Sequence, residues 1–104
     1  MTYNIELTPK ECEAIREIIT ADMENLDLAD SLYSAYDDIL HGISYSWINF
    51  TPVDEIVAHE IAQCFLVYAD RILSAEGYTV RASALLRFAM QMMNAYTYKT
   101  EADY

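Results

Sequence analysis

Glycine and proline are scarce in this chain of 104 residues, which contains two of each. An all-β protein needs many turn residues, and a disordered chain is poor in apolar side chains. Here 54% of the residues are apolar and 22% are charged. This composition excludes both classes and favours helices around one core, so we expect residues 1–104 to form a single helical domain.

Long apolar runs, a basic leader and paired cysteines are also missing. No stretch approaches the ~18 to 20 continuous apolar residues of a membrane span, and the first residues lack the layout of a signal peptide. Cys12 and Cys64 form no CxxC pair and fall at apolar positions, which predicts buried free thiols. We therefore expect a cytoplasmic protein that does not bind membranes.

Sequence signatures of catalysis are missing as well. His59 and Glu60 begin a zinc-protease motif, but Gln63 stands where its second histidine belongs. Only Asp38 and His41 have the carboxylate-to-histidine spacing of a di-iron site, and two glycines are too few for a phosphate-binding loop. We expect no enzyme activity, no metal site and no cofactor.

Helix-start signals occur four times, each with a side chain that can cap a helix. The four caps are Thr8, Asp27, Thr51 and Thr79. A proline follows the first and the third, and Glu11 and Asp54 stand three residues after these caps, where they can close a capping box. Gly42 and Gly77 are the natural ends of the second and third helices.

Apolar residues recur at three- and four-residue spacing after each start signal. The first two stripes cover residues 12–26 and 28–43. The third helix, expected over residues 52–76, is apolar around more than half of its circumference. A helix of this kind must lie at the centre of the fold or pack against a second copy of the chain.

The fourth helix carries a polar face that we expect to point away from the core, formed by Ser83, Arg87, Gln91 and Asn94. Residues 2–7 alternate polar and apolar side chains as a strand does, but a second strand exists only if residues 45–49 pair with them. We therefore predict an all-α fold, a compact four-helix bundle of two αα-hairpins with a short extended N-terminal arm.

Positive charge is scarce and unevenly distributed. The net charge is −11, and residues 1–60 contain thirteen carboxylates against Lys10 and Arg16, whereas residues 61–104 contain four residues of each sign. Nucleic acids and anionic membranes are polyanions, so this excess argues against direct binding to either. A partner recruited by charge should be a basic protein.

The carboxylates of the first two helices fall on the faces opposite the apolar stripes, with aromatic residues nearby. Carboxylates one turn apart lie ~6 Å from each other, a spacing broadly comparable with that of successive phosphates. Two interpretations stay open: a solvated face, or a partner-binding surface. The candidate binding residues are Glu13, Glu17, Glu24, Asp30, Tyr33, Asp37, Asp38, Tyr45 and Trp47.

These features lead us to expect an acidic protein-binding module, a small inhibitor that occupies the nucleic-acid-binding surface of a basic partner. In size and charge, although in no motif, the chain resembles phage-encoded inhibitors of bacterial defence nucleases, anti-CRISPR proteins among them. One alternative is an antitoxin or immunity-type protein that neutralises a basic toxin. Another is a structural or regulatory homo-oligomer, such as a homodimer formed through the third helix.

Overall fold

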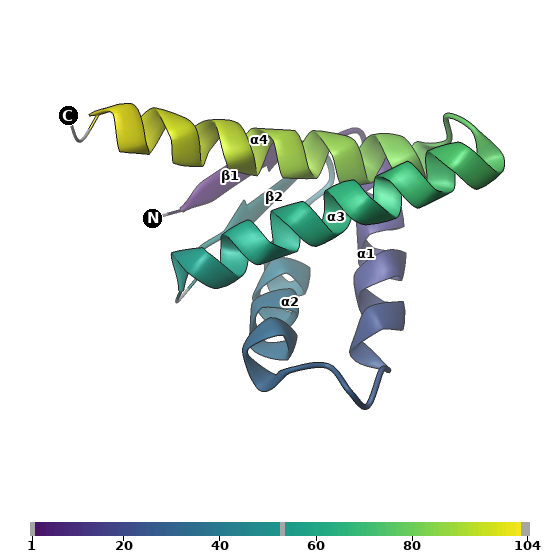
Figure 1. Cartoon of the computed structure of the whole chain (residues 1–104), viewed down its shortest axis with the longest axis horizontal. Coiled ribbons are helices and arrows are strands. Elements are labelled where there is room, and N and C mark those ends of the chain that lie inside the picture. Colours follow the sequence, from purple (N-terminus) through teal and green to yellow (C-terminus); the bar gives the residue numbers. More distant parts are fainter. Residues whose placement is uncertain (1, 53, 103–104) are drawn as a thin grey trace.

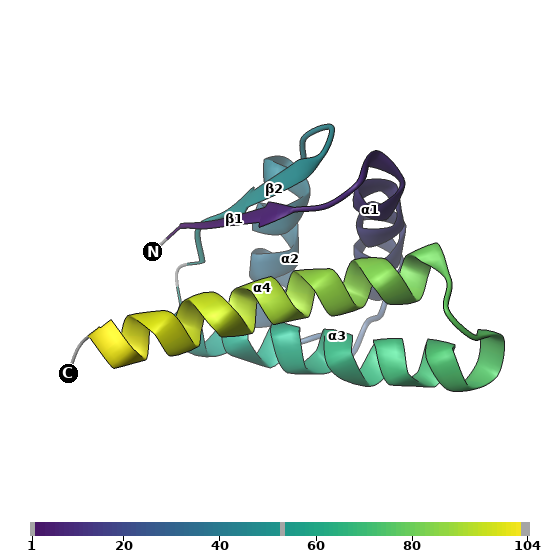
Figure 2. The same ribbon diagram turned by 90° about the horizontal axis from the view of Figure 1, so that it is seen from above.

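The computed structural model describes residues 2–52 and 54–102, and side chains up to Asn94. Two long helices form an antiparallel hairpin, and two shorter helices run crosswise to it (Figure 1). A pair of short strands lies beside α4, on the side of the hairpin that also carries the shorter helices (Figure 2). The elements are β1 (Tyr3–Glu6), α1 (Pro9–Met23), α2 (Asp30–Gly42), β2 (Trp47–Phe50), α3 (Glu55–Glu76) and α4 (Val80–Ala102).

The N-terminal arm is a strand, because β1 pairs with β2 in an antiparallel sheet that sets Tyr3 opposite Phe50 and Glu6 opposite Trp47. The inward side chains of both strands are buried, and they are Tyr3, Ile5, Ile48 and Phe50. The expectation of an all-α fold is therefore wrong for this sheet, although the chain is mostly helical as predicted. Each strand has only four residues, and its partner lies far away in the sequence, so neither is evident alone.

The bundle prediction is only roughly right. The short turn between α3 and α4 gives the predicted αα-hairpin, but α1 and α2 cross this hairpin instead of running along it (Figure 1). Phe65 of α3 shows why this helix is so apolar: its ring stacks on Tyr36 of α2 and meets Phe88 of α4 edge to face, with centroids 6.4 and 5.0 Å away. The apolar surface of α3 is therefore used against both α2 and α4, whereas α4 lies between α3 and the strands (Figure 2).

The start of α1 follows the prediction. Thr8 Oγ1 accepts a hydrogen bond from the backbone N–H of Glu11, and the Glu11 carboxylate accepts one from the N–H of Thr8. The helix ends at Met23, however, and Leu26, which we expected on its apolar stripe, is 99% exposed in the loop that follows.

Two of the expected caps are wrong. The second helix begins at Asp30, and its N-cap residue is Ala29, which has no capping side chain. Asp27, the expected cap, lies in the loop, where its N–H donates to the side chain of Asn25. The third helix is capped by Asp54, which accepts from the N–H of Ile56, whereas the hydroxyl of Thr51 contacts that of Thr2. Pairing of β2 with β1 keeps Thr51 next to the arm, and this prevents an earlier helix start.

The last two signals agree with the prediction. Thr79 caps α4 by accepting from the N–H of Ala82. Gly77 ends α3 with φ 80 and ψ −163, a conformation that is essentially restricted to glycine. Cys12 and Cys64 are free thiols as predicted, but only Cys12 is fully buried, whereas Cys64 is half-buried. Burial raises the pKa of both thiols.

Gly42 ends α2 as predicted, but for a different reason. Its φ is not positive, and a Cβ atom placed on it would overlap the carbonyl oxygen of Asn49 in β2. Glycine is needed here because the backbone of β2 passes directly over the end of the helix.

We therefore expect Gly42→Ala to lower the free energy of unfolding by about 1–3 kcal/mol or more, because backbone must move to accept one methyl group. Ala75→Gly is a matched exchange at an exposed position near the end of α3, and it should cost no more than about 1 kcal/mol. Chemical denaturation of both variants measures the difference. Equal losses would contradict the assigned role of Gly42.

Candidate protein-binding surface

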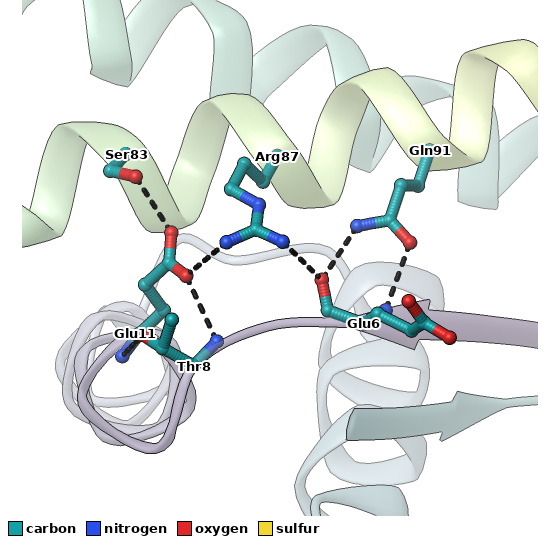
Figure 3. Close-up of polar contacts among 6 residues, drawn as sticks. All are labelled: Glu6, Thr8, Glu11, Ser83, Arg87 and Gln91. Carbon is teal, nitrogen blue, oxygen red and sulfur yellow. Dashed lines mark hydrogen bonds and ion pairs between the residues drawn. The ribbon is translucent and has the colours of Figure 1, made fainter. Parts of the chain in front are cut away.

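A network of polar contacts around Glu11 sets the position of α1 (Figure 3). Glu11 is 3% exposed, and its carboxylate accepts a hydrogen bond from the hydroxyl of Ser83 at 2.7 Å. Nη1 of Arg87 lies 2.7 Å from the other oxygen, which also accepts from the N–H of Thr8. These contacts attach the first turn of α1 to α4.

The same stripe of α4 also holds the arm. The side-chain amide of Gln91 forms a double hydrogen bond with the backbone of Glu6, at 2.9 Å to the N–H and 2.8 Å to the carbonyl (Figure 3). Arg87 Nη2 lies 3.4 Å from this carbonyl. Ser83, Arg87 and Gln91, which we expected to point away from the core, instead bind the arm and the start of α1. Their four-residue spacing gives one polar stripe, and the arm and α1 bind along it.

The charge of Glu11 is stabilised in place. Burial raises the pKa of Glu11, but the hydrogen bonds from Ser83 and Thr8 and the charge of Arg87 together hold it below its usual value. A lowered pKa in the folded protein means that the carboxylate stabilises the fold above the unfolded pKa of about 4.3. This contribution is lost as the pH falls through the folded pKa.

We expect Glu11→Gln to lower the free energy of unfolding at pH 7 by about 1–3 kcal/mol. The reason is that the NH₂ group of the new amide would face the hydrogen-bond donors of Ser83 or Arg87 and could not accept from them. The difference from wild type should shrink as the pH falls below about 4. Denaturation at a series of pH values measures both effects. Glu17→Gln removes the same charge from an exposed position and should change stability by less than about 0.5 kcal/mol, and an equal effect would contradict our view of Glu11.

The predicted acidic stripe of α1 is exposed as expected. Glu13 and Glu17 lie on its outer face, and Glu24 caps its C-terminal end. Asp30 is exposed at the first turn of α2. Among the side chains that the structure describes, none of these four carboxylates has a cationic nitrogen within 4.0 Å, so their charge is not neutralised by an ion pair.

The loop between α1 and α2 lies at the end of the molecule remote from α4 (Figure 1). Residues 24–30, which we call the acidic loop, bring Glu24, Asp27 and Asp30 to this end, all of them exposed. Leu26 is almost fully exposed between them. Sequence periodicity missed Leu26 because its spacing continues the apolar stripe of α1 for one turn beyond the end of the helix.

The position of Glu24 has a cost. Over residues 9–23, α1 has no basic side chain in its last turn, and Glu24 adds a negative charge at the negative end of the helix dipole. An exposed charge in this position costs about 0.3–1 kcal/mol. Asp30 lies at the favourable end of α2 and offsets part of this cost. The charge of the acidic loop is therefore not explained by helix stability alone.

The other two candidate carboxylates lie elsewhere. Asp37 is half-buried and interacts with His41, whose Nδ1 lies 2.7 Å from the Asp37 carbonyl oxygen and 3.6 Å from Oδ1. The hydrogen bond to this carbonyl, and then the charge of Asp37, raise the pKa of His41. Asp38 lines a groove with Asp54 between α2 and the start of α3. These two residues do not extend the acidic loop.

The aromatic candidates are all exposed but do not form one cluster. Tyr33 follows Asp30 by one turn of α2 and is the aromatic residue nearest in sequence to the acidic loop. Tyr45 shares a shallow groove with Glu13, and Lys10 and Arg16 line the same groove. Trp47 pairs with Glu6 in the sheet and lines a different groove together with Arg87. The structure thus brings Glu13 and Tyr45 together and separates Trp47 from both.

Comparisons with known proteins do not place the chain in a family: no family model, no curated protein sequence and no solved structure matches it. In the part of the chain that the structure describes, no helix combines the length and hydropathy that a bilayer span requires. Over the same residues, no three or more His, Cys, Asp or Glu side chains are grouped so that they could hold a metal ion. The interpretation therefore depends on the surface itself.

Proposed function

We propose that the chain is an acidic protein-binding module and that the outer face of α1, with the acidic loop, contacts a basic partner. The observation that carries this proposal is the set of exposed carboxylates without ion pairs at the free end of the α1–α2 pair. Their charges reinforce one another, and the cations that α1 itself carries, Lys10 and Arg16, lie in its first half, away from the acidic loop. A surface of this kind accelerates association with a positively charged partner.

Leu26 and Tyr33 add what charge alone does not provide. Electrostatic steering raises the association rate and the specificity, whereas affinity depends mainly on a few apolar or aromatic anchors that become buried. Leu26 is fully exposed among the carboxylates, and Tyr33 is half-exposed one turn away from Asp30. The partner should therefore offer an apolar pocket within a basic surface.

Nucleic-acid-binding surfaces supply the basic part of this description. Glu13 and Glu17 lie one helical turn apart, about 6 Å along α1, which is broadly comparable with the spacing of successive phosphates. We therefore propose that the chain inhibits its partner by occupying the groove that otherwise binds DNA or RNA. An antitoxin or immunity-type protein would use the same surface and differ only in the identity of the partner.

The homo-oligomer alternative receives less support from the exposed face of α3. Its large exposed apolar side chains are Ile56 and Val67, with exposures of 70% and 51%. They are separated by eleven residues, or about 16 Å along the helix, which is too far apart for one continuous patch. Light scattering over a range of concentrations separates the two proposals, since a strict monomer excludes the oligomer.

Charge reversal tests the surface directly once a partner has been captured. We expect the triple variant Glu17→Lys, Glu24→Lys, Asp30→Lys to bind at least about tenfold more weakly and to lose most of its salt dependence. The control variant Glu60→Lys, Asp70→Lys, Glu76→Lys changes the net charge equally, on exposed positions of α3. Calorimetric titrations at several salt concentrations measure both. Equal weakening by the two variants would reduce the effect to net charge and contradict a defined surface.

A further inference from the structure

A cavity of about 250 Å³ opens where α1, α3 and α4 meet, on residues that the proposed function does not use. Its apolar wall is formed by Ile18, Ile72 and Leu85, one from each helix. The volume lies just below the ~300–1,000 Å³ of typical small-molecule sites, so the cavity suits a small ligand. Such sites combine apolar walls with a few polar groups that orient the ligand.

Two of the six cationic residues of the chain line this cavity, Arg71 from α3 and Arg81 from α4. Among the described side chains, no carboxylate oxygen lies within 4.0 Å of either guanidinium group. Both arginines are exposed, and they remain without an ion pair in a chain whose net charge is −11. The pair is therefore ready to bind an oxyanion, for which the guanidinium fork is well suited.

The cavity also contains a group of opposite charge. Asp22 of α1 is half-buried, and its Oδ2 accepts a hydrogen bond from the hydroxyl of Tyr36 at 3.3 Å. Tyr68 faces the same carboxylate, and burial raises the pKa of Asp22. A carboxylate offers about four acceptor sites, so Asp22 has capacity for a donor from a ligand. One cavity thus presents an anion-binding pair, an acceptor and an apolar wall.

We propose that this cavity binds a small zwitterion with an apolar body, the chemistry of an aliphatic amino acid. The carboxylate of the ligand pairs with Arg71 and Arg81, its ammonium group donates to Asp22, and its side chain lies against the apolar wall. This proposal is independent of the acidic loop and does not rest on the proposed function.

Three probes that share one aliphatic skeleton test the assignment: L-leucine, 4-methylpentanoate, which lacks the amine, and 3-methylbutylamine, which lacks the carboxylate. Amide chemical shifts of the full chain, followed by NMR, should saturate with L-leucine in the millimolar range, with the largest changes at residues 18–22, 68–72 and 81–85. We expect 4-methylpentanoate to bind several-fold more weakly and the amine more weakly still. Absence of saturation with every probe, or equal binding of the amine and L-leucine, would overturn the proposal.

Variants separate the two charged contacts. Arg71→Gln with Arg81→Gln should weaken L-leucine binding by at least about tenfold, whereas Arg16→Gln, which removes a cation outside this cavity, should leave it unchanged. Asp22→Asn keeps an acceptor for Tyr36 and should weaken L-leucine without weakening 4-methylpentanoate. A fold preserved in the amide spectrum, together with unchanged L-leucine affinity in either variant, would contradict the assigned contacts.

Discussion

The contact between Glu11 and Arg87 fixes the arrangement on which the rest of the structure depends. A carboxylate as buried as that of Glu11 is tolerated only when its oxygens are paired and hydrogen-bonded, and here Thr8, Ser83 and Arg87 meet this requirement. The contact joins the first turn of α1 to the N-terminal half of α4. Since α1 is held at its start, its other end and the acidic loop extend away from α4 (Figure 1).

This arrangement separates the charges of the molecule. Ser83, Arg87 and Gln91 bind the arm and α1 along one stripe of α4, and Arg71 and Arg81 line the cavity between the helices. The described cations of the second half of the chain, Arg71, Arg81 and Arg87, thus all lie on the α3–α4 hairpin. The carboxylates of the acidic loop therefore repel one another at the end of the fold, away from the core. Their charges add up there to a strong local negative potential.

Local signals in the sequence predicted what depends on neighbouring residues. Thr8 and Thr79 cap helices because a hydroxyl needs only a nearby backbone N–H, and Gly77 ends α3 because only glycine adopts its backbone angles easily. The sequence did not predict contacts between distant residues. Glu11 and Arg87 are 76 positions apart. The strand pairing that moves the start of α3 from Thr51 to Asp54 joins Tyr3 to Phe50, which also lie far apart in the sequence.

The candidate site was predictable to a similar degree. Helical periodicity correctly placed Glu13, Glu17 and Asp30 on exposed faces, because burial on one face of a helix leaves the other in solvent. It could not show that Glu13 lies with Tyr45 while Asp38 lies with Asp54, since these groupings depend on how α1, α2 and the sheet pack. Leu26 was assigned to the core because the end of α1 was placed three residues too late.

Hydrogen exchange on the complex with a captured partner tests the central claim most directly, because it reports contact residue by residue without changing the protein. Binding through the acidic loop predicts that protection gained in the complex is concentrated in residues 17–34, with little change in residues 60–76 of α3. Protection centred on α3, with the loop exchanging as fast as in the free protein, would contradict the account.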